Sequence, residues 1–218
     1  MTTTPRNTLL AAAILAAAMA IPAGAAIFKD NFQLPSPAVT IPEPGAIQYT
    51  IDSGVINQTR DVSISQMALV TVGDGQLAAT CNSSATGTVI LSYGNWYGSS
   101  FGSLSDYGDK FRISTAGATG NVDATVTIWD NSSNTYKFSI LLTGGTQQEM
   151  QIADFLDTVS GSKFANQAVD AVQLTLTFDG TSSASAATVT GFEVVPEPST
   201  FALLGLATTG LVLRRRRK

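Results

Sequence analysis

The central part of the chain alternates apolar and polar residues with a period of two. In residues 124–129, Ala, Val and Ile alternate with Thr and Trp, and a similar spacing recurs in residues 136–142 and 172–178. This pattern predicts half-buried β-strands whose apolar side chains face a core. The turn-forming sequence DNSSN at residues 130–134 separates the first two segments and predicts a β-hairpin.

Shorter segments of the same kind extend this pattern along the chain. They are Val62–Ser65, Leu69–Val72, Thr88–Ser92, Lys110–Ser114 and Phe192–Val195. Strands this numerous, spaced by Gly, Ser and Asn turns, predict an all-β fold, an antiparallel β-sandwich over residues 48–195. Residues 151–158 (QIADFLDT) are open to two interpretations, a helical turn or a strand followed by a bend.

The segment before the predicted sandwich, residues 26–47, is rich in proline. Four prolines fall within ten residues there, and proline fixes φ and donates no backbone hydrogen bond. The segment is therefore expected to be an irregular approach to the first strand.

The first 25 residues have a different organisation. Arg6 precedes the apolar stretch Leu9–Ala20, and Ala23-Gly24-Ala25 forms a small-x-small site directly before Ala26. This layout predicts a helical signal peptide over residues 1–25, cut between Ala25 and Ala26. The alternative is a membrane anchor, but the apolar stretch is shorter than the ~20 residues that a span needs.

Residues 196–218 contain three features in order. The triplet Pro196-Glu197-Pro198 comes first, and the apolar segment Phe201–Leu213 follows it. The basic cluster is Arg214, Arg215, Arg216, Arg217 and Lys218. A helix of this apolar length spans about 20 Å, which predicts a short transmembrane helix that inserts marginally. The basic cluster is expected to stay cytoplasmic, so the sandwich faces outward.

A triplet, a short apolar helix and a basic cluster in this order resemble the PEP-CTERM sorting signal of Gram-negative bacteria. The resemblance implies recognition of residues 196–198 by exosortase, a membrane protease-transpeptidase. Residues 201–213 would be a transient anchor in the inner membrane and residues 214–218 the stop-transfer cluster. The body would pass through the export machinery and end at the cell surface or outside the cell. A second triplet at residues 42–44 lacks the apolar and basic parts, so we do not interpret it as a signal.

Charge and composition exclude several classes of function. Residues 26–195 contain six Lys/Arg against fifteen Asp/Glu, a net charge of −9, which disfavours nucleic acid as a partner. The chain has no histidine, so a Ser-His-Asp hydrolase is excluded. Cys81 is the only cysteine, which excludes an intramolecular disulfide and thiolate zinc sites, and it is expected to be buried. We predict no cofactor and no metal site.

Candidate chemistry concentrates in the aromatic-rich segment Ser92–Phe111. Trp96 and Tyr97 could stack on sugar rings, whereas the other interpretation is that the aromatic residues of this segment cap the core. Asp106 and Asp109 could donate oxygen ligands to calcium, but their spacing fits an ordinary turn and no EF-hand loop. A glycosidase needs two carboxylates across a cleft. Those of Glu149, Asp154 and Asp157 are close in sequence, but nothing distinguishes them from the others.

Three hypotheses for function follow. The first is a non-catalytic exported protein with a structural or adhesive role in extracellular polysaccharide or biofilm. The second is a carbohydrate-binding module with its sugar site at Trp96 and Tyr97, and the third is a polysaccharide-active enzyme. Residues 54–62, 169–178 and 188–194 weakly resemble jelly-roll domains of the carbohydrate-binding-module type. That resemblance implies a fold and identifies no binding residues.

Overall fold

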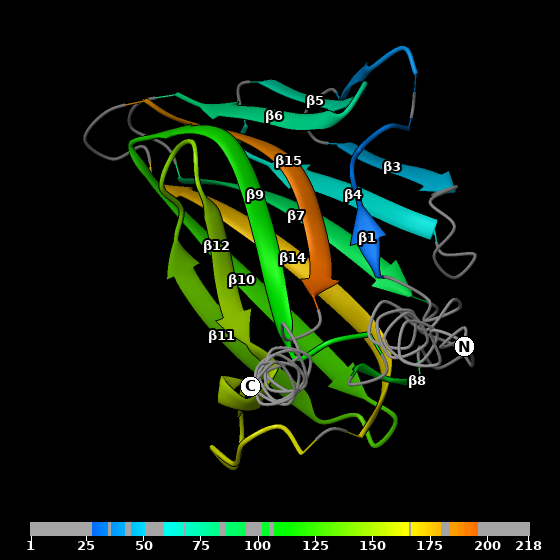
Figure 1. Ribbon diagram of the computed structural model, residues 1–218. Helices are drawn as coiled ribbons and strands as arrows, with labels where there is room; N and C mark the ends of the chain where they lie inside the picture. Colours follow the sequence, from blue (N-terminus) through cyan, green and yellow to red (C-terminus); the bar gives the residue numbers. More distant parts are fainter. Residues whose placement is uncertain are drawn as a thin grey trace, which may run out of the picture. The chain divides into compact units, whose positions relative to one another are not determined.

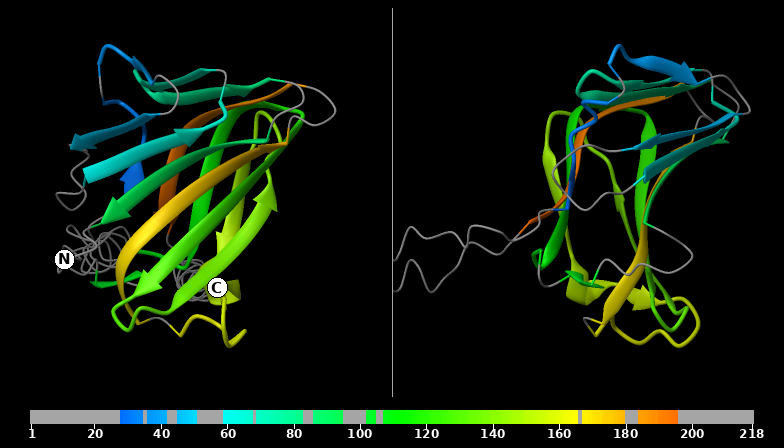
Figure 2. Two further views of the ribbon diagram at one scale, coloured as in Figure 1. Left: turned by 180° about the vertical axis from the view of Figure 1, so that it is seen from behind. Right: turned by 90° about the vertical axis from the view of Figure 1, so that its right-hand side faces the viewer.

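The structure is a computed structural model and describes most of the chain between residues 28 and 195. The described ranges are 28–34, 36–41, 45–50, 59–67, 69–82, 86–94, 102–104, 107–165, 167–179 and 184–195. Within them, two antiparallel sheets face each other, as the edge-on view in Figure 2 shows. The helices predicted at residues 1–25 and 201–213 lie outside these ranges. Among the described residues, no helix is long and apolar enough to cross a membrane.

The first sheet contains seven of the described strands, in the order β12-β9-β15-β6-β5-β2 with β1 beside β15 (Figure 1). Their bounds are β1 (Lys29–Asp30), β2 (Val39–Ile41), β5 (Leu69–Gly73), β6 (Gln76–Cys81), β9 (Lys110–Thr119), β12 (Gln147–Gln151) and β15 (Ser185–Val195). Asp74 and Gly75 join β5 to β6 with φ angles of 50° and 89°. An Asp-Gly pair suits such a hairpin because both central positions need positive φ.

The second sheet contains eight of the described strands, in the order β13-β11-β10-β14-β7-β4-β3 with β8 beside β14. Their bounds are β3 (Gly45–Thr50), β4 (Thr59–Ser65), β7 (Thr86–Gly94), β8 (Gly102–Ser103), β10 (Asn121–Asp130), β11 (Thr135–Leu141), β13 (Leu156–Asp157) and β14 (Ala168–Asp179). In the register, Val126 of β10 lies opposite Phe138 of β11 and Leu174 of β14. The apolar positions of neighbouring strands therefore share the inner face.

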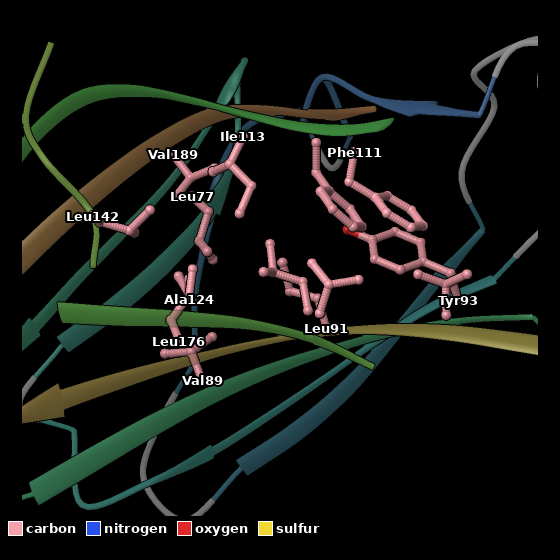
Figure 3. Packing of buried hydrophobic residues seen from close by; sticks show 14 of the residues in the cluster. Leu77, Val89, Leu91, Tyr93, Phe111, Ile113, Ala124, Leu142, Leu176 and Val189 are labelled. Carbon is pink, nitrogen blue, oxygen red and sulfur yellow. The ribbon is translucent and has the colours of Figure 1, made fainter. Parts of the chain in front are cut away.

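The core lies between the two sheets. Val89, Leu91 and Leu176 project from the eight-stranded sheet, and Leu77, Ile113 and Val189 project from the seven-stranded one (Figure 3). All of these side chains are buried, and Cys81 is buried too, as expected. The chain crosses repeatedly from one sheet to the other, and the predicted jelly-roll-like antiparallel sandwich is confirmed.

The local predictions have mixed outcomes. The hairpin around residues 130–134 is confirmed as β10–β11. Residues 151–158 contain a 3₁₀ turn, η2 (Ile152–Asp154), followed by β13, so both interpretations are partly right. The expectation that residues 26–47 are irregular is wrong for β1, β2 and the start of β3, because the prolines stand between these short strands and not within them.

Candidate functional site

The candidate site lies where the chain enters and leaves the sandwich. We call it the terminal edge and define it as residues Phe28–Asp30 together with Phe192–Val195 of β15. Val194 is buried, with 1% of its surface exposed, and lies opposite Phe111 of β9. The backbone N–H of Asp109 donates to the carbonyl of Val195 at 3.2 Å. The last strand therefore stays fixed in the sheet up to its final residue.

The N-terminal segment pairs with the other side of β15. Lys29 lies opposite Glu193, and the backbone N–H of Val194 donates to the carbonyl of Phe28 at 2.9 Å. β6 pairs with β15 only over Ser185–Val189, so it leaves the last part of β15 uncovered. β1 covers that part, and it satisfies backbone groups that would otherwise be exposed at a strand edge.

A buried ion pair holds β1 from inside the sandwich. Asp30 is 2% exposed and Arg60 of β4 is 1% exposed, and Arg60 Nη1 lies 2.5 Å from Asp30 Oδ2. The hydroxyl of Tyr93 on β7 donates to the same oxygen at 3.0 Å, and the N–H of Phe32 donates to Oδ1 at 2.8 Å. Burial raises the pKa of Tyr93 well above 10, and the negative charge of Asp30 raises it further. The cluster therefore joins residues of three separate segments.

The residues after β1 complete the environment of the arginine. Arg60 Nη2 donates to the carbonyl of Leu34, and the guanidinium lies over the Phe32 ring, 5.1 Å from its centroid. Phe32 has a φ of 55°, a conformation that costs a bulky residue on the order of 1–3 kcal/mol. Because Phe32 is fully buried, its packing and the cation–π contact offset that cost.

Aromatic rings fill the space behind the ion pair. The Phe28 ring makes edge-to-face contacts with Tyr93, Phe111 and Phe192, with centroid distances of 5.3, 6.3 and 5.5 Å. Figure 3 shows Tyr93 and Phe111 pointing toward each other from opposite sheets. Tyr93 and Phe111 come from the aromatic-rich segment, and both are buried in the core. For these two residues the core interpretation is correct.

Alternating charges lie on the outer face of the seven-stranded sheet, on β1 and β15 of the terminal edge and on the adjacent β9 and β12. Glu193 lies 3.4 Å from Lys29 and 3.5 Å from Arg112, and Glu149 lies 2.8 Å from Arg112 and 2.7 Å from Lys110. Hydrogen bonds from Lys110 and Arg112 lower the pKa of Glu149, and the bond to Glu149 raises the pKa of Lys110. Since these side chains are partly exposed, solvent screens their charges and each pair stabilises the sheet only weakly.

The carboxylates considered for catalysis all have structural partners. Glu149 is ion-paired as above, Asp154 lies 3.1 Å from Lys163, and Asp157 accepts the N–H of Val159 at 2.9 Å. Hydrogen bonds from the backbone and side chain of Ser160 lower the pKa of Asp157. Each of the three carboxylates therefore has its own set of partners.

The remaining predicted site residues lie mostly outside the described ranges. These are Ala25, Ala26, Trp96, Tyr97, Asp106 and all of residues 196–218. Asp109 is described, and both of its carboxylate oxygens are buried with no hydrogen-bond partner among the described residues. Among the described residues, no three acidic, Cys or His side chains gather into a potential metal site.

Neither Asp30 nor Arg60 was predicted from the sequence as a site residue. One signal was present for Arg60: it shares the strand face of Val62 and Ile64, so alternation alone places this cation toward the core. A buried arginine needs a carboxylate, but nothing in the sequence indicates that its partner is Asp30, 30 residues earlier.

Comparison with known proteins identifies the C-terminal segment. Residues 194–217 match the model of the PEP-CTERM protein-sorting motif, which confirms the resemblance proposed from the sequence. The match begins within the terminal edge, at Val194. No curated protein matches the chain.

Several solved structures have a distantly similar architecture. The agarase AgWH50C has a TM-score of 0.40 and 13% identity, over 63% of this chain and 22% of its own length. The family 11 carbohydrate-binding module of the Clostridium thermocellum cellulase Lic26A-Cel5E has a TM-score of 0.34 and 11% identity, over 71% and 96%. The family 11 xylanase from Neocallimastix patriciarum has a TM-score of 0.37 and 12% identity, over 71% and 96%. The chain thus spans about a fifth of the agarase, and these likenesses assign it no activity.

Proposed function

We propose that the chain is a non-catalytic exported protein that exosortase sorts to the cell surface or extracellular matrix. The observation that carries this proposal is the sorting motif at residues 194–217, which begins within the last strand of the sandwich. The tail of the motif follows the body without an intervening linker. Its partners are exosortase, the export machinery and, transiently, the inner membrane.

Removal of the tail is compatible with an intact body. All described strands end at or before Val195, so a cut after this residue removes none of their hydrogen bonds. It also removes the five basic residues of the tail and leaves a body with a net charge of −9. An acidic, Thr- and Ser-rich sandwich suits a structural or adhesive role within hydrated polysaccharide.

Two matched triplet variants test the sorting function. Replacement of Pro196, Glu197 and Pro198 by alanine should leave the tail attached and the protein in the membrane fraction. The same replacement at Pro42, Glu43 and Pro44 changes identical residue types outside the motif and should leave sorting unchanged. Immunoblots of membrane and extracellular fractions, with an epitope tag placed after Lys218, measure both. Equal release of the two variants would contradict the proposal.

A second candidate function is carbohydrate binding by the outer face of the eight-stranded sheet. Gln173, Ser92 and Asp61 occupy consecutive register positions across β14, β7 and β4, and all three are partly exposed. Gln173 Nε2 donates to Ser92 Oγ at 3.1 Å, whereas Asp61 Oδ1 is buried and has no donor within the described ranges. Such a row of polar groups, with one unsatisfied acceptor, favours a ligand rich in hydroxyl groups.

Native affinity gels test the second candidate. The processed protein would run in gels with and without the host's extracellular polysaccharide, beside Trp96→Ala and Asp61→Ala. Leu69→Ala, on the other sheet and 49% exposed, is the matched control. A sugar site would be supported if polysaccharide slows the wild type and the Leu69→Ala control, and slows Trp96→Ala or Asp61→Ala less. Equal mobility of all forms with and without polysaccharide would exclude this function for that polysaccharide.

A further inference from the structure

The two ends of the folded body are neighbours in space. Val194, where the sorting motif begins, bonds to Phe28, which is three residues after the predicted signal-peptide cut at Ala25. β1 and β15 are antiparallel, so the chain enters and leaves the sandwich at the same end of one sheet (Figure 1). Phe28 and Val194, the described residues next to the two predicted processing points, are therefore paired, although nearly the whole sequence separates them.

The end of β15 depends on β1 for one of its two neighbours. Beyond Val189, β9 still pairs on one side, but β6 has ended on the other. Only β1 supplies a partner on that side among the described strands, through Lys29 and Asp30. When β1 is absent, Val194 keeps pairing on one side only, and the residues before the tail form an open strand edge.

Docking of β1 is incompatible with a bound signal peptidase. Only Ala26 and Ile27 separate the predicted scissile bond from Phe28, and two extended residues span about 7 Å. Phe28 is 3% exposed and packs among three aromatic rings, so it is not accessible to an enzyme when β1 is docked. The signal cut, in which water attacks the Ala25 carbonyl and frees the Ala26 amine, must come before docking.

We propose that the docking of β1 onto β15 links the two processing steps in a fixed order. Signal-peptide cleavage frees the N-terminal segment, β1 docks, and the completed end of β15 then presents the tail to exosortase. In the second step a peptide bond after Val195 breaks, and water or an amine takes the acyl group. This inference rests on the proposed sorting function.

The first test blocks the first cut. Ala25→Leu removes the small residue that the signal-peptide site needs, and Ala20→Leu changes an apolar residue outside that site as its control. A pulse-chase with intact-mass analysis would follow both ends of the full chain in the host. Among exported chains, we expect the tail of Ala25→Leu to persist at least about tenfold longer than the tail of the control. Removal of the tail at the control rate from chains that keep the signal peptide would overturn the proposal.

The second test acts on β1 itself. Asp30→Ala should slow removal of the tail without affecting the signal cut, whereas Asn31→Ala, at the exposed position just outside the terminal edge, should not slow it. The Lys29 and Glu193 positions form a non-hydrogen-bonded pair, a geometry that accepts a disulfide, so Lys29→Cys with Glu193→Cys can hold β1 in place. Added to Asp30→Ala, this disulfide should restore removal of the tail. Failure of the oxidised chain to recover would contradict the proposal.

The wild type separates this inference from the function on which it rests. If wild-type chains keep their tail, the proposed sorting function fails. If they lose it, and Ala25→Leu and Asp30→Ala chains lose it at the same rate, sorting stands and the fixed order is wrong.

Discussion

Two buried aspartates hold two different parts of the sandwich, and they do so by different chemistry. Asp30 at the terminal edge meets a full opposite charge on Arg60, 30 residues away, and the hydroxyl of Tyr93, 63 residues away. In the described part of the chain, Asp130 of the β10–β11 hairpin accepts hydrogen bonds from neutral groups only. They are the backbone N–H groups of Ser132 and Asn134, the side-chain amides of Asn134 and Gln167, and the Tyr136 hydroxyl.

The difference shows what each aspartate contributes. Asp130 accepts three of these five hydrogen bonds from residues within four positions, so most of its effect is local to the turn. Asp30 joins the N-terminal segment to β4 and β7, so its loss affects the end of the sheet where the sorting motif begins. Removal of one member of a buried ion pair also destabilises the fold more than removal of a neutral hydrogen-bond partner, because an unpaired charge stays buried.

The largest effect is expected from Asp30→Ala. The variant leaves the Arg60 guanidinium buried without its carboxylate, which should lower the free energy of unfolding by about 3–5 kcal/mol. Urea denaturation of the mature protein measures the loss, and Lys29→Ala, next to it on the exposed face, is the control. A loss below about 1 kcal/mol would show that Arg60 finds another partner.

A smaller effect is expected from Asp130→Ala. Several neutral donors would lose their acceptor, but water can reach the turn, so the loss should be about 1–3 kcal/mol. Hydrogen exchange should show faster opening of β10–β11 and no change at the terminal edge. Asn131→Ala, exposed in the same loop, provides the comparison, and equal effects of the two variants would contradict the role of Asp130.

The tyrosines of the two clusters sharpen the comparison at alkaline pH. Burial, supplemented by the neighbouring aspartate, raises the pKa of Tyr93 well above 10 and also raises that of Tyr136. The unfolded chain loses these protons first, so stability is fully present below pH ~10 and falls as the pH rises above it. Tyr93→Phe should remove more of this decline than Tyr136→Phe in urea titrations between pH 9 and 11. The reverse order would be inconsistent with the burial of Tyr93.

The smallest effect belongs to the charges on the outer face. Because Lys110 and Arg112 lower the pKa of Glu149, its carboxylate contributes stability above pH ~4.5 and loses it as the pH falls. Glu149→Gln should lower the free energy of unfolding by less than about 1 kcal/mol at pH 7. It should also make the loss of stability between neutral and acid pH smaller. Gln148→Glu, at the adjacent position, is the control and should not reduce the loss of stability at acid pH.

The fold could be predicted from the sequence where alternation was strong. Residues 124–129, 136–142 and 172–178 became β10, β11 and β14, because side chains on one strand face share one environment. β6 and β12 were missed, since QLAATC and QQEMQ are too small or too polar to show a buried face. The proline-rich segment concealed β1, whose position depends on contacts with distant strands.

The candidate site was predicted only in part. The sorting motif has a local signature and was identified, whereas the Asp30–Arg60 pair joins residues that no spacing rule connects. Trp96 and Tyr97 remain predictions, because they lie outside the described residues.

The most direct measurement of the central claim is the intact mass of the protein recovered from outside the cell. A chain that begins at Ala26 and lacks residues 214–218 is the predicted result, because it requires both the signal cut and removal of the sorting tail. Recovery of an exported chain that still ends in Arg-Arg-Arg-Arg-Lys would contradict the account.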